Sequence, residues 1–199
     1  PIFSFDFTGA KRGVLPASYD YLRLEGRMQY RLNLPPIGYS QLMLEGGKIF
    51  GKVPYLLLKL HEGNGTYFYD RYAFSCMNFY EFSSDAWISF FYEHHFNGFL
   101  LGRVPLLKKL NWREVFVFKG VYGTLSARND GSLPNTKAVM LFPVGMSSVE
   151  HPYLETGFGI ENIFRLLRVD CIWRLTHHRA VPGLSIPTFT VNFSLNLKF

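Results

Sequence analysis

Polar and apolar residues alternate without a fault in Leu22-Arg23-Leu24-Glu25-Gly26-Arg27-Met28-Gln29-Tyr30-Arg31-Leu32-Asn33. Successive side chains of a β-strand point to opposite faces, so this pattern predicts a strand with one apolar and one polar face. Such a run is long for a strand of a soluble sheet. A strand that crosses a membrane at a tilt needs about 9–11 residues. The length therefore favours a membrane-spanning strand, with a soluble antiparallel sheet as the alternative.

The same alternation recurs along most of the chain. It predicts further strands over residues 1–9, 38–50, 85–96, 112–125, 152–162, 165–178 and 187–199. The apolar faces of these strands are rich in aromatic residues, and the polar faces carry small or oppositely charged groups. This arrangement is typical of strands between lipid and a polar lumen. We therefore expect an all-β fold, an antiparallel transmembrane outer-membrane β-barrel to which this chain contributes eight strands.

The composition excludes several other classes. Of the 199 residues, 48% are hydrophobic and 18% are charged, which excludes intrinsic disorder. No apolar run approaches the length of about 18 residues that a transmembrane helix needs. The formal net charge of +6 suits a membrane surface, an anionic glycan or nucleic acid. Nucleic acid is not expected as a partner, because the basic residues alternate with apolar ones and form no patch.

The connections between the predicted strands differ in length. Residues 34–38 and 162–165 form short turns, as on the periplasmic side of outer-membrane barrels, and residues 51–84 form a long outer loop. This loop is too aromatic for a freely solvated tip, and we expect it to plug the lumen or pack on the rim. The residues expected to form the plug are Tyr67, Phe68, Tyr69, Asp70 and Tyr72. Residues 97–111 form a periplasmic amphipathic turn, which either rests on lipid headgroups or packs under the barrel rim.

The polar faces of two neighbouring predicted strands carry complementary charges. The residues expected to form a charge ladder in the lumen are Glu155, Glu161, Arg168, Asp170 and Arg174. The short turn at 162–165 sets Gly159 near Arg168 in the expected register. On the strand over residues 22–33, Met28 and its even-numbered neighbours are expected to face lipid, and the odd-numbered arginines are expected to face the lumen.

The two ends of the chain suggest how it relates to a larger protein. Residues 191–199 alternate and stop at Phe199, which resembles the C-terminal assembly signal of outer-membrane barrels. The chain begins within a strand-like pattern and without an initiator methionine. We therefore expect it to be the C-terminal part of a longer protein, whose N-terminal part supplies the missing strands. Residues 1–9 and 187–199 are then not expected to pair with each other.

The sequence offers no catalytic, cofactor or metal site. His94 and His95 are adjacent and so point to opposite faces of a strand, where they cannot share one metal ion. Cys76 and Cys171 are far apart and imply neither a disulfide framework nor a metal site. No serine, histidine and aspartate occur in the arrangement of a hydrolase with a nucleophile elbow. An enzymatic function is therefore not expected.

Several blocks of the sequence resemble one bacterial family. They are Glu93-His94-His95-Phe96-Asn97-Gly98-Phe99, Val104-Pro105-Leu106-Leu107-Lys108-Lys109-Leu110-Asn111-Trp112-Arg113-Glu114, Gly159-Ile160-Glu161-Asn162-Ile163-Phe164-Arg165, Leu167-Arg168-Val169-Asp170 and Trp173-Arg174-Leu175-Thr176, with Tyr67-Phe68-Tyr69-Asp70 and Ala73-Phe74 in the long loop. They resemble an outer-membrane β-barrel family of unknown function in Bacteroidota. Its members join an N-terminal carboxypeptidase-regulatory-like β-sandwich to a C-terminal barrel. The resemblance implies that residues 1–199 are the C-terminal half of that barrel.

This family is more remotely similar to surface-antigen barrels of the BamA and TamA type, which have sixteen strands and a long loop folded into the lumen. The present chain has Gly65-Thr66-Tyr67-Phe68-Tyr69 where those barrels carry an Arg-Gly-aromatic loop tip. The resemblance implies a location in the bacterial outer membrane and a non-enzymatic role in envelope biogenesis, or in the insertion or translocation of protein or lipid. Outer-membrane lipid and other envelope proteins are the expected partners. The alternatives are a passive porin or structural channel, and the barrel anchor of a surface enzyme.

Overall fold

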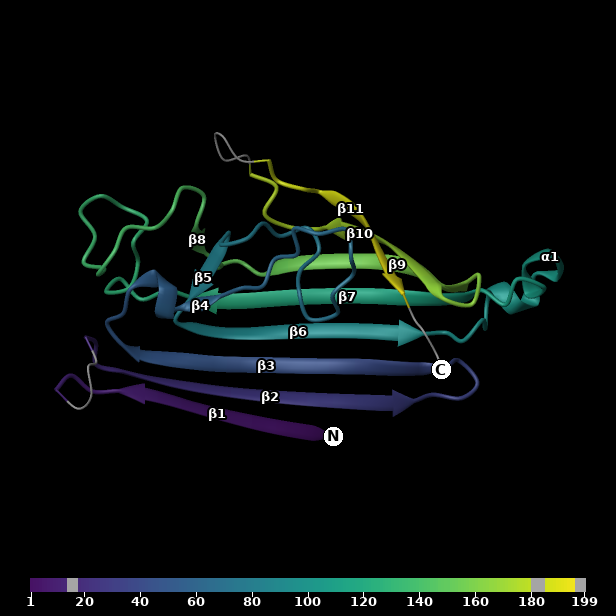
Figure 1. Ribbon diagram of the computed structural model, residues 1–199, viewed down its shortest axis with the longest axis horizontal. Coiled ribbons are helices and arrows are strands. Elements are labelled where there is room, and N and C mark those ends of the chain that lie inside the picture. The colour runs from purple at the N-terminus through teal and green to yellow at the C-terminus, as the bar shows by residue number, and fades with distance from the viewer. Residues whose placement is uncertain (14–17, 180–184, 196–199) are drawn as a thin grey trace.

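The computed structural model describes residues 1–13, 18–179 and 185–195 of the chain. Its main element is a sheet of eight antiparallel strands, which run side by side along the long axis of the molecule (Figure 1). In their order across the sheet, the strands are β1 (Ile2–Ala10), β2 (Tyr21–Asn33), β3 (Tyr39–Gly51), β6 (Ala86–His95), β7 (Arg113–Thr124), β9 (Tyr153–Ile163), β10 (Leu167–Arg174) and β11 (Phe189–Leu195). The predicted all-β class and the eight antiparallel strands are therefore confirmed.

Each predicted strand range coincides with one observed strand, but β10 ends earlier than expected, at Arg174 rather than at residue 178. The guanidinium group of Arg174 donates hydrogen bonds to the carbonyls of Thr176 (3.0 Å) and His177 (2.7 Å). His177 has a positive φ of 59°, so the chain turns away from the sheet here. Side-chain capping of the main chain thus ends the strand although the alternation continues.

The register between β9 and β10 also differs from the predicted one. Gly159 lies opposite Asp170, two residues beyond the expected partner Arg168. Ile163 pairs with Leu167, so the turn between the strands lies closer to the C-terminus than the predicted turn at residues 162–165. A β-bulge lies between Leu167 and Val169. Because the difference is two residues, the side chains keep the faces that the alternation predicts.

On one face of the sheet lies no loop among the described residues, and this face is called the bare face here. It presents the apolar residues of the alternating pattern to the outside. Its exposed members include Phe3, Phe5, Phe7, Leu22, Tyr30, Ile88, Tyr122, Phe158 and Trp173. Phe5 is 71% exposed and Phe158 is 60% exposed, so no layer of described residues covers these large side chains, although neighbouring rings such as Phe116 and Phe158 contact each other within the face. An apolar face of this extent marks a surface that contacts lipid or another molecule.

The opposite face is called the covered face, because residues 61–81 lie on it; we name this segment the covering loop. The covering loop connects β4 (Lys59–Leu60) to β5 (Phe82–Ser84) and contains no strand of its own. Phe74 of the loop is completely buried, with ring centroids 5.1 Å from Phe91 and 5.3 Å from Tyr153. The loop and the sheet therefore share a hydrophobic core, which stabilises the loop in this position.

A second, smaller sheet lies at one end of the molecule and was not predicted. It consists of β4, β5 and β8 (Ser147–Ser148), with a short 3-10 helix at Tyr55–Leu57 before β4. The pairing of β5 with β8 is parallel, unlike every pairing in the main sheet. These strands are too short to produce a periodic pattern in the sequence.

The turn between β6 and β7 forms two short helices, at Leu101–Arg103 and α1 (Pro105–Lys108). Figure 1 shows α1 projecting beyond the sheet, at the end opposite to the small sheet. Leu106 is 79% exposed and lies beside Lys108 and Lys109 in sequence, as expected for an amphipathic segment. Over the described residues, no helix has both the length and the hydrophobicity required to span a bilayer.

The sheet is open, with β1 and β11 at its two edges. Within the described residues these edge strands do not pair with each other, as predicted. The free edge of β11 instead contacts the covering loop, where Phe68 forms an isolated parallel bridge with Phe193. Phe199, the expected assembly signal, lies outside the described residues.

Candidate functional site beneath the covering loop

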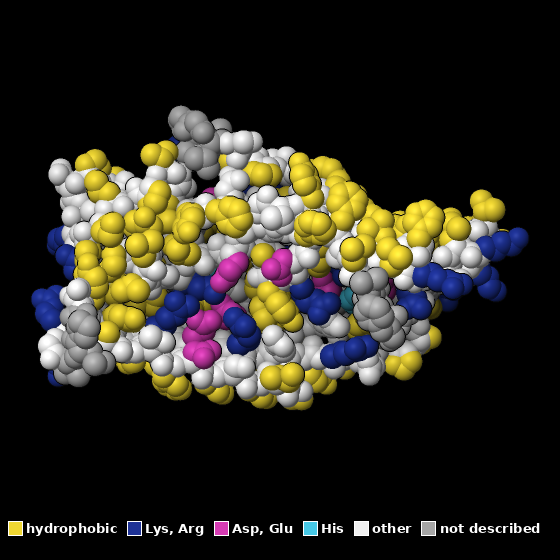
Figure 2. Space-filling view, viewed as in Figure 1, with side chains coloured by type: hydrophobic (Ala, Val, Ile, Leu, Met, Phe, Trp, Pro, Cys, Tyr) yellow, Lys and Arg dark blue, Asp and Glu magenta, His cyan; other side chains and the backbone are white. Residues whose placement is uncertain are grey.

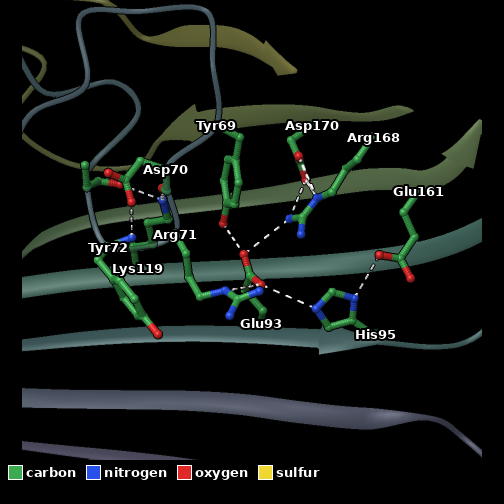
Figure 3. A network of polar contacts seen from close by, with 11 residues as sticks. Tyr69, Asp70, Arg71, Tyr72, Glu93, His95, Lys119, Glu161, Arg168 and Asp170 are labelled. Atoms are coloured by element: carbon green, nitrogen blue, oxygen red, sulfur yellow. Dashed lines mark hydrogen bonds and ion pairs between the residues drawn. The ribbon is translucent and has the colours of Figure 1, made fainter. Parts of the chain in front are cut away.

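Glu93, on β6, is the centre of a buried network of polar side chains (Figure 3). Its carboxylate accepts hydrogen bonds from Arg71 Nε at 2.9 Å and from Arg168 Nη2 at 3.3 Å. The hydroxyl group of Tyr69 donates to the same carboxylate. Glu93 is only 1% exposed, and an isolated buried carboxylate is strongly unfavourable. The two arginines and the tyrosine compensate for its loss of hydration.

The network continues on both sides of Glu93. On β10, Arg168 Nε and Nη2 each lie 2.8 Å from an oxygen of Asp170, two residues along the same strand. On β6, His95 Nε2 lies 3.4 Å from Glu93, and His95 Nδ1 lies 3.1 Å from Glu161 of β9. Both ring nitrogens of His95 thus face carboxylate oxygens, which a protonated imidazole satisfies.

Tyr69 connects the covering loop to this network through its ring as well as its hydroxyl group. The guanidinium carbon of Arg168 lies 4.4 Å from the ring centroid, and Lys119 Nζ lies 4.5 Å from it. Two cations therefore interact with one aromatic ring, each by a cation–π contact. Lys119 also donates to the carbonyls of Asp70 at 2.8 Å and Ala73 at 2.6 Å. The sheet thus holds the loop at three positions, Tyr69, Asp70 and Ala73.

Glu155, on β9, anchors the next part of the covering loop. Its carboxylate accepts hydrogen bonds from the backbone N–H groups of Ser75 (2.8 Å) and Cys76 (2.7 Å) and from the hydroxyl group of Tyr153 (2.6 Å). Backbone amides that a loop cannot pair internally need such acceptors when they are buried. A carboxylate on the sheet therefore takes the place of a strand partner for the loop.

Two further groups of ion pairs lie toward the small sheet. Arg174 Nη2 pairs with Glu81 at 2.5 Å, near the end of the covering loop. Lys59 of β4 pairs with Glu45 of β3 at 2.7 Å, and Arg27 of β2 pairs with the same glutamate at 2.6 Å. In Figure 2, acidic and basic side chains lie together in a central band between hydrophobic regions. The charges of the covered face are therefore mostly paired and do not form a single-sign patch.

The predicted charge ladder needs a correction in its pairing. Glu155, Glu161, Arg168, Asp170 and Arg174 are all buried and come from β9 and β10. Of these five, only Arg168 and Asp170 bind each other directly; Glu161 joins them through His95 and Glu93. Arg174 lies opposite Glu155 in the sheet but pairs with Glu81, while Glu155 binds loop amides. The covering loop supplies nearer partners, and it thereby divides the ladder into separate clusters.

The five residues expected to form the plug have different environments. Tyr69 reaches the buried network, and the Tyr72 ring packs edge-on against Phe91 at 6.3 Å. Tyr67 and Phe68 are 77% and 69% exposed, and Asp70 is exposed too. Phe74 is the fully buried aromatic of the loop. Alternation predicts only faces of strands, and so it could not identify which loop residues point inward.

Catalytic and metal-binding chemistry finds little support in the described part of the chain. No group of three or more His, Cys, Asp or Glu side chains there is arranged to hold a metal ion. His61 Nε2 contacts Ser84 Oγ at 3.0 Å, but both residues are buried and no described carboxylate orients the other ring nitrogen. Both cysteines are free; burial, and then the charge of Glu155, raises the pKa of the Cys76 thiol to about 12. A thiol that stays protonated at neutral pH is a poor nucleophile.

The described contacts hold the covering loop against the sheet. Comparison with known proteins agrees with the resemblance to an uncharacterised family. Residues 1–127 match the family described as Family of unknown function (DUF5686) C-terminal domain. No curated protein matches the chain. Because the match covers more than half of the 199 residues, the chain belongs to this family and contains its C-terminal domain.

Proposed function

We propose that this chain is half of a transmembrane barrel of about sixteen strands in the bacterial outer membrane. Its role is non-enzymatic, in envelope biogenesis or in the insertion or translocation of protein or lipid. The observation that carries the proposal is the separation of the two faces of the sheet. Across eight strands the bare face is apolar and exposed, while on the strands from β3 to β10 the covered face buries charged side chains that are mostly paired.

The lengths of the strands support a membrane location. Strands β2 and β3 have 13 residues each, β7 has 12 and β9 has 11. A tilted strand needs about 9–11 residues to cross the hydrocarbon core. A soluble sheet of such strands would need a second layer on its bare face, and Phe5 and Phe158 have none within the described residues.

The covering loop supports a role other than free diffusion of solutes. Core packing, ion pairs and backbone hydrogen bonds fix it against the covered face, which would form the lumen wall. A loop held in this way narrows the lumen. Strands from the other half of the barrel would pair with the edge of β1 and with the part of the β11 edge that the covering loop leaves free. A partly occluded barrel with a seam at these strands suits the handling of protein or lipid at the membrane.

Depletion of the protein in its host is the direct test. We expect the amounts of other folded outer-membrane barrels, or the distribution of lipid between the two leaflets, to change before growth stops. Single-channel recording of the purified protein in a planar bilayer is the companion measurement, and we expect a small conductance. A large, steady conductance together with an unchanged envelope would instead support the passive porin.

A further inference from the structure

A polar cavity of about 860 Å³ lies at the end of the covered face remote from the small sheet. Its wall includes four arginines, Arg31, Arg71, Arg113 and Arg168, and one glutamate, Glu161. Cavities of about 300–1,000 Å³ are typical of sites for small molecules. The cavity lies beside the network around Glu93, but nothing in the role of the covering loop accounts for its excess of arginines.

Two of the arginines are already neutralised. Arg71 pairs with Glu93 at 2.9 Å, and Arg168 pairs with both Glu93 and Asp170. Glu161, in turn, is bound by His95. Arg31 and Arg113 form no ion pair with any described residue, so they supply the surplus positive charge of the cavity.

Aromatic stacking holds Arg31 in place. Its guanidinium carbon lies 4.0 Å from the centroid of the Tyr39 ring, and that ring stacks on His95 at 4.4 Å with an angle of 11° between the planes. Stacking of this kind fixes the plane of the guanidinium group and leaves its N–H donors free. Arg31 is therefore preorganised to bind an anion without losing an existing ion pair.

Arg113 approaches the cavity from the other side. Arg31 is on β2 and Arg113 is on β7, with β3 and β6 between them. In the register of the sheet Arg31 is level with Val117 of β7, four residues from Arg113. Three strand spacings across the sheet and about 13 Å along β7 separate the two main chains by roughly 19 Å, which two long side chains can span with a phosphate group between them. Donors that converge from different directions fit a tetrahedral phosphate group, which has acceptor oxygens on several sides. A planar carboxylate is satisfied by one bidentate arginine.

Gln41, which also lines the cavity, indicates that the ligand supplies a hydrogen-bond donor as well as an anion. Its side-chain oxygen is buried and accepts no hydrogen bond from the described residues. An unsatisfied buried acceptor costs about 1–3 kcal/mol. A turn of the Gln41 amide toward the cavity would present this oxygen to a ligand donor, and that hydrogen bond would remove the cost. A ligand with a hydroxyl group near its phosphate supplies both the anion and the donor.

We propose that this cavity binds a phosphate ester that carries hydroxyl groups, of the glycerol phosphate or sugar phosphate type. The ligand phosphate lies between Arg31 and Arg113, and a ligand hydroxyl group donates to Gln41. Free metabolites and lipid headgroups both contain this chemistry. The inference rests on the cavity and does not require the role in envelope biogenesis.

The test is calorimetric titration of the purified full chain in a non-ionic detergent with three probes. These are inorganic phosphate, glycerol 3-phosphate and short-chain dihexanoyl phosphatidylglycerol. We expect glycerol 3-phosphate to bind more tightly than inorganic phosphate. Binding of the phosphatidylglycerol in addition assigns the site to a lipid headgroup, and its failure to bind assigns the site to a soluble ester. Absence of binding by all three probes at about 10 mM would overturn the proposal.

Variants test the assigned residues. Arg31→Gln and Arg113→Gln should each weaken the binding of glycerol 3-phosphate about tenfold or more, as expected for loss of a hydrogen bond to a charged group. Arg103→Gln is the matched control, because Arg103 also stacks on an aromatic ring, Phe99, at 4.0 Å but lies outside the cavity. Gln41→Met should reduce the preference for glycerol 3-phosphate over inorganic phosphate.

The unliganded variants also separate folding from binding. Arg31 and Arg113 hold no ion pair among the described residues, and the stacking of Arg31 on Tyr39 is worth only about 0.5–1 kcal/mol, so the loss of either arginine should lower the thermal unfolding midpoint only slightly. If either glutamine variant unfolds early, Arg31→Lys and Arg113→Lys keep the charge while removing the bidentate geometry, and they should still weaken binding. Wild-type affinity in folded variants at both positions would show that the cavity is not the binding site.

Discussion

Tyr69 and Phe193 are joined through their main chains, since the N–H of Tyr69 donates to the carbonyl of Phe193 at 2.8 Å. The N–H of Phe193 donates in return to the carbonyl of Tyr67 at 2.7 Å. Asn192 Nδ2 adds a bond of 3.0 Å to the carbonyl of Thr66. The covering loop therefore occupies part of the edge of β11, where another strand would otherwise pair. An edge covered in this way is protected from incorrect pairing.

Cross-linking can establish whether this contact exists in the membrane. We expect the double variant Phe68→Cys, Phe193→Cys to form a disulfide under mild oxidation, because bridged residues have main chains about 5 Å apart. The pair Phe68→Cys, Phe189→Cys is the control, since residue 189 lies about 13 Å further along β11. The measurement is a change in electrophoretic mobility that a reductant reverses. Equal cross-linking of both pairs would mean that the loop moves freely along the edge.

Glu93→Gln should release the covering loop. The substitution keeps the shape of the side chain but removes the charge that Arg71, Arg168 and His95 share. Breaking a buried ion pair on one side costs about 3 kcal/mol. We expect a lower thermal unfolding midpoint in detergent and faster proteolysis within residues 61–81.

The control for this experiment is Glu62→Gln. The side chain of Glu62 is 54% exposed and pairs only with Lys59 among the described residues, so its loss should change stability little. If Glu93→Gln left both the midpoint and the proteolysis pattern unchanged, the network would not be what holds the loop.

Adjacent residues on β2 test the orientation of the strands. Met28 belongs to the bare face and Gln29 to the covered face, so Met28→Arg should impair assembly into membranes and Gln29→Arg should not. A charge on the lipid face near the bilayer midplane costs about 2–4 kcal/mol. The yield of folded protein, measured as the heat-sensitive electrophoretic form, distinguishes the two variants. Normal assembly of Met28→Arg would argue against a bare face in lipid.

Acid should destabilise the protein partly through His61. Burial, and then the nearby charge of Lys59, lowers the pKa of this histidine to about 3. Below the ordinary pKa of about 6.5, the unfolded chain binds a proton that the folded protein does not bind. The stabilisation from neutral His61 is therefore complete above pH 6.5 and declines as the pH falls toward 3.

His61→Gln should weaken this dependence of the unfolding midpoint on pH between 6.5 and 4. His178→Gln is the control, because His178 is exposed. Identical pH profiles for wild type and His61→Gln would show that His61 titrates normally in the folded protein.

The main sheet was predictable because its strands carry their burial pattern in the local sequence. The residues 22–33 alternate throughout, and β2 is observed from Tyr21 to Asn33. The bulge between Leu167 and Val169 was not predictable, since a single unpaired residue leaves no periodic signal. The same is true of β4 and β8, each of which has two residues.

Of the residues that form the site, only those on the main sheet were predictable; those on the covering loop were not. Alternation correctly assigns Arg168 and Asp170 to one face, but it does not identify Glu93 as the centre of the network. Three of the partners of Glu93 are far from it in sequence: Tyr69 and Arg71 are more than 20 positions away, and Arg168 is 75 positions away. Contacts between a loop and a distant strand depend on tertiary packing, which local periodicity does not encode. The pairing of Arg174 with Glu81 was missed for the same reason.

Several ion pairs of the sheet join residues two positions apart on a single strand. Arg23 contacts Glu25 at 2.6 Å, and Arg168 contacts Asp170 at 2.8 Å. A pair of this kind contains both charge and counter-ion on one strand, so it stays balanced whichever strand lies beside it. The other charges of β2 and β10 depend on neighbours, since Arg27 pairs with Glu45 of β3 and Arg174 pairs with Glu81 of the covering loop. Exchange of a hairpin during evolution would therefore leave the pairs within a strand intact and disturb only those that join different segments.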